Sequence, residues 1–258
     1  MADALLALSA MRGLGSVTRR DNYLDTLIFA LEADTSSRLR HAALRALFDA
    51  RSKLVEVVEQ EKGEFREKLL TKLAPALSTA TKPGSPQKFD DKPDTVFDPR
   101  RDGCYLRLIF ALAKQSDWRA QLKRAGHIDR CIYLLDHVIG NADLSVTSHP
   151  YYLAGTLIRM NASGAAVPTP PSLPHNISER VCWNLIKGAW CAMDSNVLHL
   201  EEEAVEALPD MVTYTLDLLK TPTAFYDTKS LVLPVNRISL AFGDGEAKLK
   251  MKRLRDAL

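Results

Sequence analysis

Several features that mark specialised protein classes are missing from this sequence of 258 residues. It holds four cysteines, at positions 104, 131, 182 and 191, and none of them forms a CxxC pair. Isolated thiols within apolar helical patterns are typical of a reduced compartment inside the cell. No apolar run approaches the roughly 18 residues of a membrane-spanning helix. We therefore expect an intracellular protein, cytoplasmic or nuclear, without a membrane span.

An excess of one charge is lacking as well. The chain has 34 basic and 32 acidic residues, which leaves a formal net charge of +2. Dedicated nucleic-acid-binding proteins usually carry a marked basic excess, so we do not expect a nucleic acid as the main partner. The apolar fraction of 46% and the charged fraction of 26% are those of an ordinary soluble globular protein.

Catalytic motifs are missing too. The sequence contains no Gly-rich phosphate loop, no GxSxG elbow and no HExxH zinc motif. His127 and Cys131 are four residues apart on a predicted helix and could in principle share a metal ion. No second pair at ligand spacing accompanies them. The sequence thus predicts a non-enzymatic protein that uses no metal and no other cofactor.

A five-residue sequence occurs twice. The segment 27–31 reads LIFAL, and 108–112 repeats it unchanged, 81 positions later. A looser copy occupies 184–190. Each copy lies in a stretch whose apolar residues follow helical spacing. Such repetition is typical of an α-solenoid, in which each helical unit buries its apolar face by stacking on its neighbours.

Helical spacing continues through most of the chain, and strand-like alternation is absent from the sequence. We expect helices at 3–12, 21–33, 37–50, 52–60, 63–79, 103–115, 116–124, 128–139, 177–194, 198–220 and 246–258. Ser116 and Asp117 are the expected cap of their helix, and Pro209 is an expected interruption. The segment 231–235 could be extended.

Two polar, proline-rich stretches break this pattern. Residues 81–101 and 161–175 together hold eight of the 13 prolines. Stretches of this composition between helices are typical of surface loops, because proline and glycine end regular structure. We therefore expect two loop insertions within one repeat domain that spans 1–258.

The segment 105–135 resembles an armadillo repeat. The resemblance rests on the turn 122–128, which reads LKRAGHI, and on the apolar pairs 131–132 and 134–135 that follow it. Armadillo repeats carry a similar Ala-Gly-x-Ile turn between a short helix and the next one. The resemblance implies an all-α, right-handed α-solenoid of armadillo-like repeats. It also implies a concave groove that binds extended peptides or other proteins.

Two sets of residues are candidates for partner binding. Arg38, His41 and Arg45 share one side of a predicted helix and could receive an acidic partner. The competing interpretation is a solvated polar face. Trp183 and Asn184 are similar to the Trp and Asn ladder of peptide-binding armadillo proteins, although they are adjacent in sequence. Trp183 can equally pack in the core with Ile186 and Trp190.

The function that we expect from the sequence is a non-enzymatic scaffold or adaptor that binds a partner protein or peptide. The alternative from another class is a HEAT-like nucleic-acid-processing enzyme of the DNA glycosylase type, which needs a basic concave face. The near-neutral charge favours the scaffold. Neither the partner nor the oligomeric state follows from the sequence.

Overall fold

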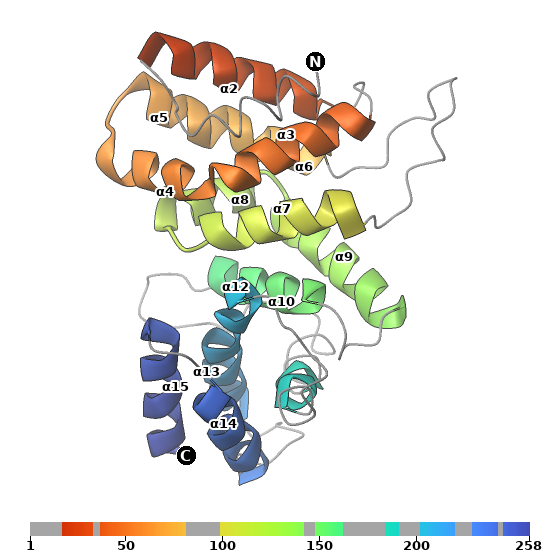
Figure 1. Ribbon diagram of the computed structural model, residues 1–258, viewed down its shortest axis with the longest axis vertical. Coiled ribbons are helices and arrows are strands. Elements are labelled where there is room, and N and C mark those ends of the chain that lie inside the picture. The colour runs from red at the N-terminus through yellow and green to blue at the C-terminus, as the bar shows by residue number, and fades with distance from the viewer. Residues whose placement is uncertain are drawn as a thin grey trace. The chain divides into compact units, whose positions relative to one another are not determined.

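The computed structural model describes residues 17–32, 37–80, 99–141, 148–161, 184–190, 202–219, 229–241 and 245–258. Every regular element in these ranges is a helix and no strand occurs among them, which confirms the predicted all-α class (Figure 1). The chain divides into two compact units, residues 1–137 and 138–258. The superhelical solenoid and the single repeat domain stay predictions.

The first unit is a stack of short helices. They are α2 (Val17–Leu31), α3 (Ser37–Asp49), α4 (Arg51–Gln60), α5 (Glu64–Lys68), the π-helical turn η1 (Leu69–Leu73), α6 (Ala74–Ala80), α7 (Pro99–Leu112), α8 (Ser116–Arg124) and most of α9 (His127–Asn141). Helix α3 packs between α2 and α7, and α4 also packs on α7 (Figure 1). Their facing sides are apolar, so burial of leucine and alanine side chains stabilises the stack.

The two LIFAL copies occupy equivalent positions in their helices. One ends α2 at Leu31 and the other ends α7 at Leu112. Their environments differ, because Phe29 is 53% exposed whereas Phe110 is 2% exposed. Helix α7 packs against both α3 and α4. The repeat therefore specifies a helix end, and the packing around it decides which side chains are buried.

The turn between α8 and α9 agrees with the sequence prediction. Gly126 has φ 78°, in the left-handed region that favours glycine. A Cβ at this position would meet nothing within 4 Å, so only the backbone conformation calls for glycine here. The amide of Gly126 donates to the carbonyl oxygen of Lys123 over 3.1 Å and closes the turn.

Two expectations for the first unit are wrong. Helix α7 begins at Pro99, inside the stretch 81–101 that was expected to be a loop insertion. Proline suits the first position of a helix, since its missing N–H has no partner to lose there. Ser116 is the first residue of α8 and not its cap. The N-cap is Gln115, which has extended backbone angles and makes no side-chain capping bond.

The second unit is built around α13. Its described helices are α10 (His149–Asn161), the segment 184–190, α12 (Glu202–Val205), α13 (Ala207–Leu219), α14 (Lys229–Ala241) and α15 (Glu246–Ala257). Helix α13 packs on α10, α12 and α15, and α15 also packs on α14. Asp210 of α13 accepts from Nε of Arg159 over 2.9 Å and pairs with Lys250 at 3.5 Å. This carboxylate thus links α10, α13 and α15.

Two expectations for this unit are also wrong. Residues 231–235 are helical, because they lie within α14, and Pro234 is accommodated inside that helix. The interruption expected at Pro209 lies instead at Glu206, between α12 and α13. Pro209 is the third residue of α13, where a helix tolerates proline because its first N–H groups have no partner within the helix.

Some expectations lie outside the described residues. These are the helix at 3–12, nearly all of the insertion at 161–175, most of the one at 81–101, and both ends of the helix at 177–194, of which 184–190 is described and helical. Among the helices in the described ranges, none is both long and apolar enough to cross a lipid bilayer.

Candidate functional site

A polar groove of about 680 Å³ lies in the first unit, between the chain that links α4 to α5 and the chain that links α7 to α8. The residues around it come from three helices, α4, α5 and α8, and from two turns. They are Val58, Glu59, Glu61, Lys62, Gly63, Arg66, Glu67, Lys114, Gln115, Ser116 and Asp117. Most of these side chains are charged or polar, so the groove suits a polar ligand.

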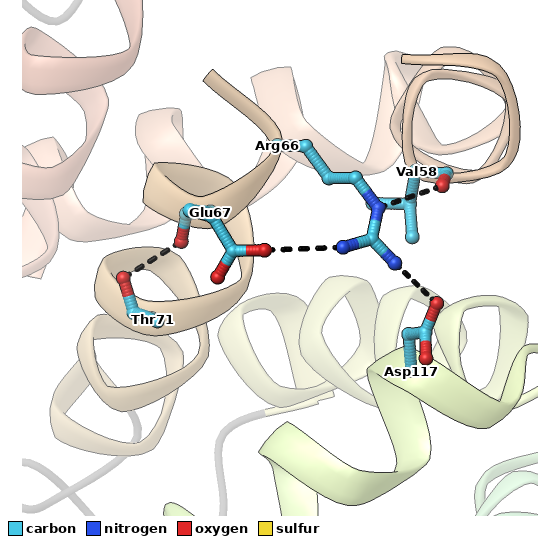
Figure 2. Close-up of polar contacts among 5 residues, drawn as sticks. All are labelled: Val58, Arg66, Glu67, Thr71 and Asp117. Atoms are coloured by element: carbon cyan, nitrogen blue, oxygen red, sulfur yellow. Dashed lines mark hydrogen bonds and ion pairs between the residues drawn. The ribbon is translucent and has the colours of Figure 1, made fainter. Parts of the chain in front are cut away.

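Arg66 of α5 lines the groove and lies at the centre of the polar contacts drawn in Figure 2. Its Nε donates to the carbonyl oxygen of Val58 over 3.1 Å, and Nη1 donates to Oε1 of Glu67 over 3.1 Å. Nη2 donates to Oδ2 of Asp117 at the start of α8. The guanidinium therefore connects α4, α5 and α8, and it is positioned before any ligand arrives.

The backbone around Arg66 follows from local sequence. Gly63 precedes α5 with φ 130° and ψ −164°, a conformation open almost only to glycine. This break, which the sequence predicted, lets the chain reverse between α4 and α5. On the opposite side, Nη1 of Arg119 donates to the carbonyl oxygens of Ala113 and Lys114 over 3.2 and 2.9 Å. Arg119 thereby satisfies backbone acceptors at the end of α7.

Gln115 is held in one orientation. Its Nε2 donates to the carbonyl oxygen of Val55 over 2.9 Å, which assigns the nitrogen and the oxygen of the amide. The remaining atom, Oε1, is buried and accepts no hydrogen bond from any residue that the structure describes. A buried acceptor without a donor costs free energy, and Gln115 is one of the residues that line the groove.

The charges in the groove are mixed. Four carboxylates, from Glu59, Glu61, Glu67 and Asp117, stand against three cations, from Lys62, Arg66 and Lys114. Within the described ranges, no group of three or more His, Cys, Asp or Glu side chains is placed to hold a metal ion. What the groove offers a ligand is charge pairing and hydrogen bonding.

A second polar cluster is buried in the first unit. Nε2 of His127 lies 2.7 Å from the carbonyl oxygen of Ala74, which can only accept, so Nε2 carries the proton. Nδ1 then accepts from the hydroxyl of Tyr105 over 2.7 Å. Burial lowers the pKa of His127 to about 4, against the opposing effect of the bond to Ala74. The ring is therefore neutral at pH 7.

Cys131 belongs to the same buried cluster. Burial raises the pKa of its thiol to about 12, although Arg130 and the hydroxyl of Tyr105 act in the opposite direction. Both His127 and Cys131 are 0% exposed. Both nitrogens of the ring of His127 are engaged by protein atoms. The cluster connects α6, α7 and α9 and does not present a reactive group to solvent.

Four of the five residues predicted for partner binding are described, and none of these four lines the groove. Arg38 and Arg45 are exposed on α3 and His41 is half-buried there, so all three share this helix as predicted. Arg45 pairs with Asp49 at 3.3 Å. Asn184 is exposed in the second unit, and Trp183 lies outside the described residues. Partner binding by these residues stays a prediction.

Sequence reasoning missed the groove itself. Arg66 and Asp117 are 51 residues apart, and Gln115 and Val55 are 60 apart. The sequence predicted helix boundaries at Gly63 and at Ser116, but no local pattern says that these two boundaries face each other. Comparison with family models, with curated proteins and with solved structures finds no match for the chain. The armadillo-like family therefore stays a prediction.

Proposed function

We propose that the chain is a non-enzymatic interaction module and that the polar groove binds an extended segment of a partner protein. The orientation of Gln115 is the observation that carries this proposal. Its amide is fixed by Val55, and its buried oxygen can accept an N–H group. The backbone of an extended peptide presents such N–H groups in any sequence.

The size and charge of the groove support the same ligand. A groove of about 680 Å³ falls within the usual 300–1,000 Å³ of binding pockets, enough for a few residues of a peptide. Exposed Lys62 offers pairing for acidic side chains, and exposed Glu59 offers it for basic ones. A segment of mixed charge fits this arrangement better than a ligand of one sign.

The DNA glycosylase alternative gains no support from the groove. Phosphate backbones require a surplus of Lys and Arg, and here carboxylates outnumber cations. A duplex would therefore meet repulsion at Glu59, Glu61 and Glu67. Strongly salt-dependent binding of duplex DNA that competes with peptide for the groove would instead establish this alternative.

The test is selection of peptides from a random display library on the full chain. Gln115→Ala should lower the affinity of the selected peptides by at least about tenfold. This is the loss of affinity expected when a buried hydrogen bond of roughly 1.4 kcal/mol is removed. Gln121→Ala, the same substitution on α8 outside the groove lining, should change their affinity less than about twofold.

Thermal unfolding separates a loss of binding from a loss of folding. If the melting temperature of Gln115→Ala is clearly lowered, Lys62→Ala serves as the test variant. The side chain of Lys62 is exposed, so its removal leaves the helices intact. Selected peptides that bind both variants as tightly as the original protein would refute the groove as the binding site.

A further inference from the structure

Helix α14 of the second unit exposes leucine side chains beside basic ones. Lys229, Leu233, Arg237 and Leu240 are all exposed, and the exposed fractions of the two leucines are 51% and 73%. Successive residues of a helix are about 100° apart around its axis, so the spacing i, i+4, i+8 and i+11 places all four within an arc of about 80°. These four residues are called the α14 stripe below.

The leucines of the α14 stripe lie between its basic residues. Counted around the helix axis from Lys229, Leu240 lies at about 20°, Leu233 at about 40° and Arg237 at about 80°. The opposite side of α14 is buried, and its buried apolar residues are Leu231, Val235 and Ile238. The two leucines of the stripe therefore project away from the core of the unit. Apolar side chains gathered on one exposed face and bordered by polar ones are typical of a binding surface.

The neighbouring helix continues this combination of leucine and positive charge. Helix α15 packs beside α14, as Figure 1 shows. It holds five basic and two acidic residues, and α14 holds two basic residues and no acidic one. The two helices thus have a surplus of five positive charges, whereas the whole chain has a net charge of only +2. Leu249 near the start of α15 is 50% exposed and stands in the sequence between exposed Lys248 and Lys250.

Three of these cations remain available to a ligand. Arg237 of α14 and both Lys252 and Arg253 of α15 are exposed. None of these three side chains forms a hydrogen bond or an ion pair with another residue in the part of the chain that the structure describes. In contrast, Lys250 pairs with Asp210, and Arg255 pairs with its neighbour in the sequence. Side-chain pairing within the described ranges therefore leaves three positive charges on this surface.

Leucines flanked by basic side chains suit the surface of an anionic lipid bilayer. Such a surface offers negative headgroups, with hydrocarbon directly below them. The leucines of the α14 stripe can enter the boundary of the acyl chains, while long basic side chains on their flanks extend to the headgroups. A protein interface suits this composition less, because its binding hot spots are enriched in Trp, Tyr and Arg and depleted in leucine.

We propose that the α14 stripe, together with the exposed cations of α15, binds the surface of a membrane that contains anionic lipids. The site belongs to the second unit, whereas the polar groove lies in the first, so it stands or falls independently of peptide binding in the groove. Each basic side chain near such a surface strengthens binding by about fivefold. The binding is therefore reversible, and added salt weakens it by screening these charges.

The test is co-sedimentation of the full chain with phosphatidylcholine vesicles that either contain or lack phosphatidylserine. The chain should bind the vesicles with phosphatidylserine at least about tenfold more tightly than those without it. Leu240→Gln should lower the affinity for the anionic vesicles by at least about fivefold, because it removes an inserting apolar side chain. Phe29→Gln is the matched control at a 53% exposed apolar residue of the first unit, and should change this affinity by less than about twofold.

A second pair of variants tests the charge. Arg237→Gln should lower the affinity for anionic vesicles by about fivefold, and Arg124→Gln, the same change at an exposed site on α8, by less than about twofold. If the melting temperature of Leu240→Gln is clearly lowered, the charge pair alone decides the test.

Three results would overturn the proposal. The first is equal binding, or no binding, to the two kinds of vesicle. The second is an equal effect of each variant and its control on the affinity for anionic vesicles. The third is a dimer of the chain in sedimentation velocity that Leu240→Gln dissociates, because the α14 stripe would then be covered by a second copy of the chain.

Discussion

At the scale of single residues, the neutral ring of His127 has a consequence for acid stability. Its pKa in the folded protein is about 4, against 6.5 for an unperturbed histidine. Between these two pH values the unfolded chain binds a proton that the folded protein excludes. The free energy of unfolding therefore falls as the pH drops from about 6.5 to about 4, and is unaffected by this group above that window.

The expected loss is on the order of 3 kcal/mol, since one pKa unit corresponds to about 1.4 kcal/mol. Urea unfolding at several pH values between 4 and 7.5 measures it. His127→Gln removes the titrating ring but keeps an amide that can donate to Ala74. In this variant the free energy of unfolding should depend less steeply on pH between about 4 and 6.5 than in the original protein. Identical slopes in both proteins would show that His127 is not the group responsible.

Residue identity alone gave part of the candidate site. The sequence predicted a turn at Gly126 and placed Arg45 on the same helix as Arg38 and His41, as the structure shows. It did not connect Arg45 with Arg51 and Arg107, which lie over the same phenylalanine ring, because their meeting depends on how α3, α4 and α7 pack. Tertiary packing likewise decides why Phe29 is exposed and Phe110 buried in identical segments.

At the scale of elements, helices with regular apolar spacing were predicted well and α14 was not. Its β-branched residues and the internal Pro234 suggested extended chain, because proline breaks a helix interior and β-branched side chains favour strands. Helix α14 packs on α15, and its Leu231, Val235 and Ile238 are buried; this burial outweighs the local preference. Local sequence carries no information about that partner helix.

Pro234 should therefore reduce the stability of α14. As the sixth residue of the helix it removes one backbone hydrogen bond, and its ring crowds the preceding turn. We expect Pro234→Ala to raise the free energy of unfolding by about 1–2 kcal/mol. Pro209→Ala is the matched control, because Pro209 is also buried but lies in the first turn of α13, where proline costs little.

Chemical denaturation followed by circular dichroism compares the two variants. Pro209→Ala should stay within about 0.5 kcal/mol of the original protein. A clear loss of stability on Pro234→Ala would mean that the ring of Pro234 fills space in the core that alanine leaves empty.

At the scale of the molecule, the two compact units predict that the first one folds alone. The contacts from Arg66 to Asp117 and from Tyr105 to His127 lie within residues 1–137. A fragment of residues 1–141, which ends where α9 ends, should melt cooperatively. It should also keep the pH dependence described for His127. A fragment without a cooperative transition would contradict this independence.

The span of the groove's contacts determines when it forms. Helices that are consecutive in the chain, such as α2 and α3, meet across short loops, whereas Arg66 must find Asp117 across 51 residues. Closing a longer loop costs more entropy, and distant contacts form late in folding. The groove is thus completed only in a fully assembled unit. Any ligand that binds there slows unfolding of the first unit and protects its amide protons from exchange.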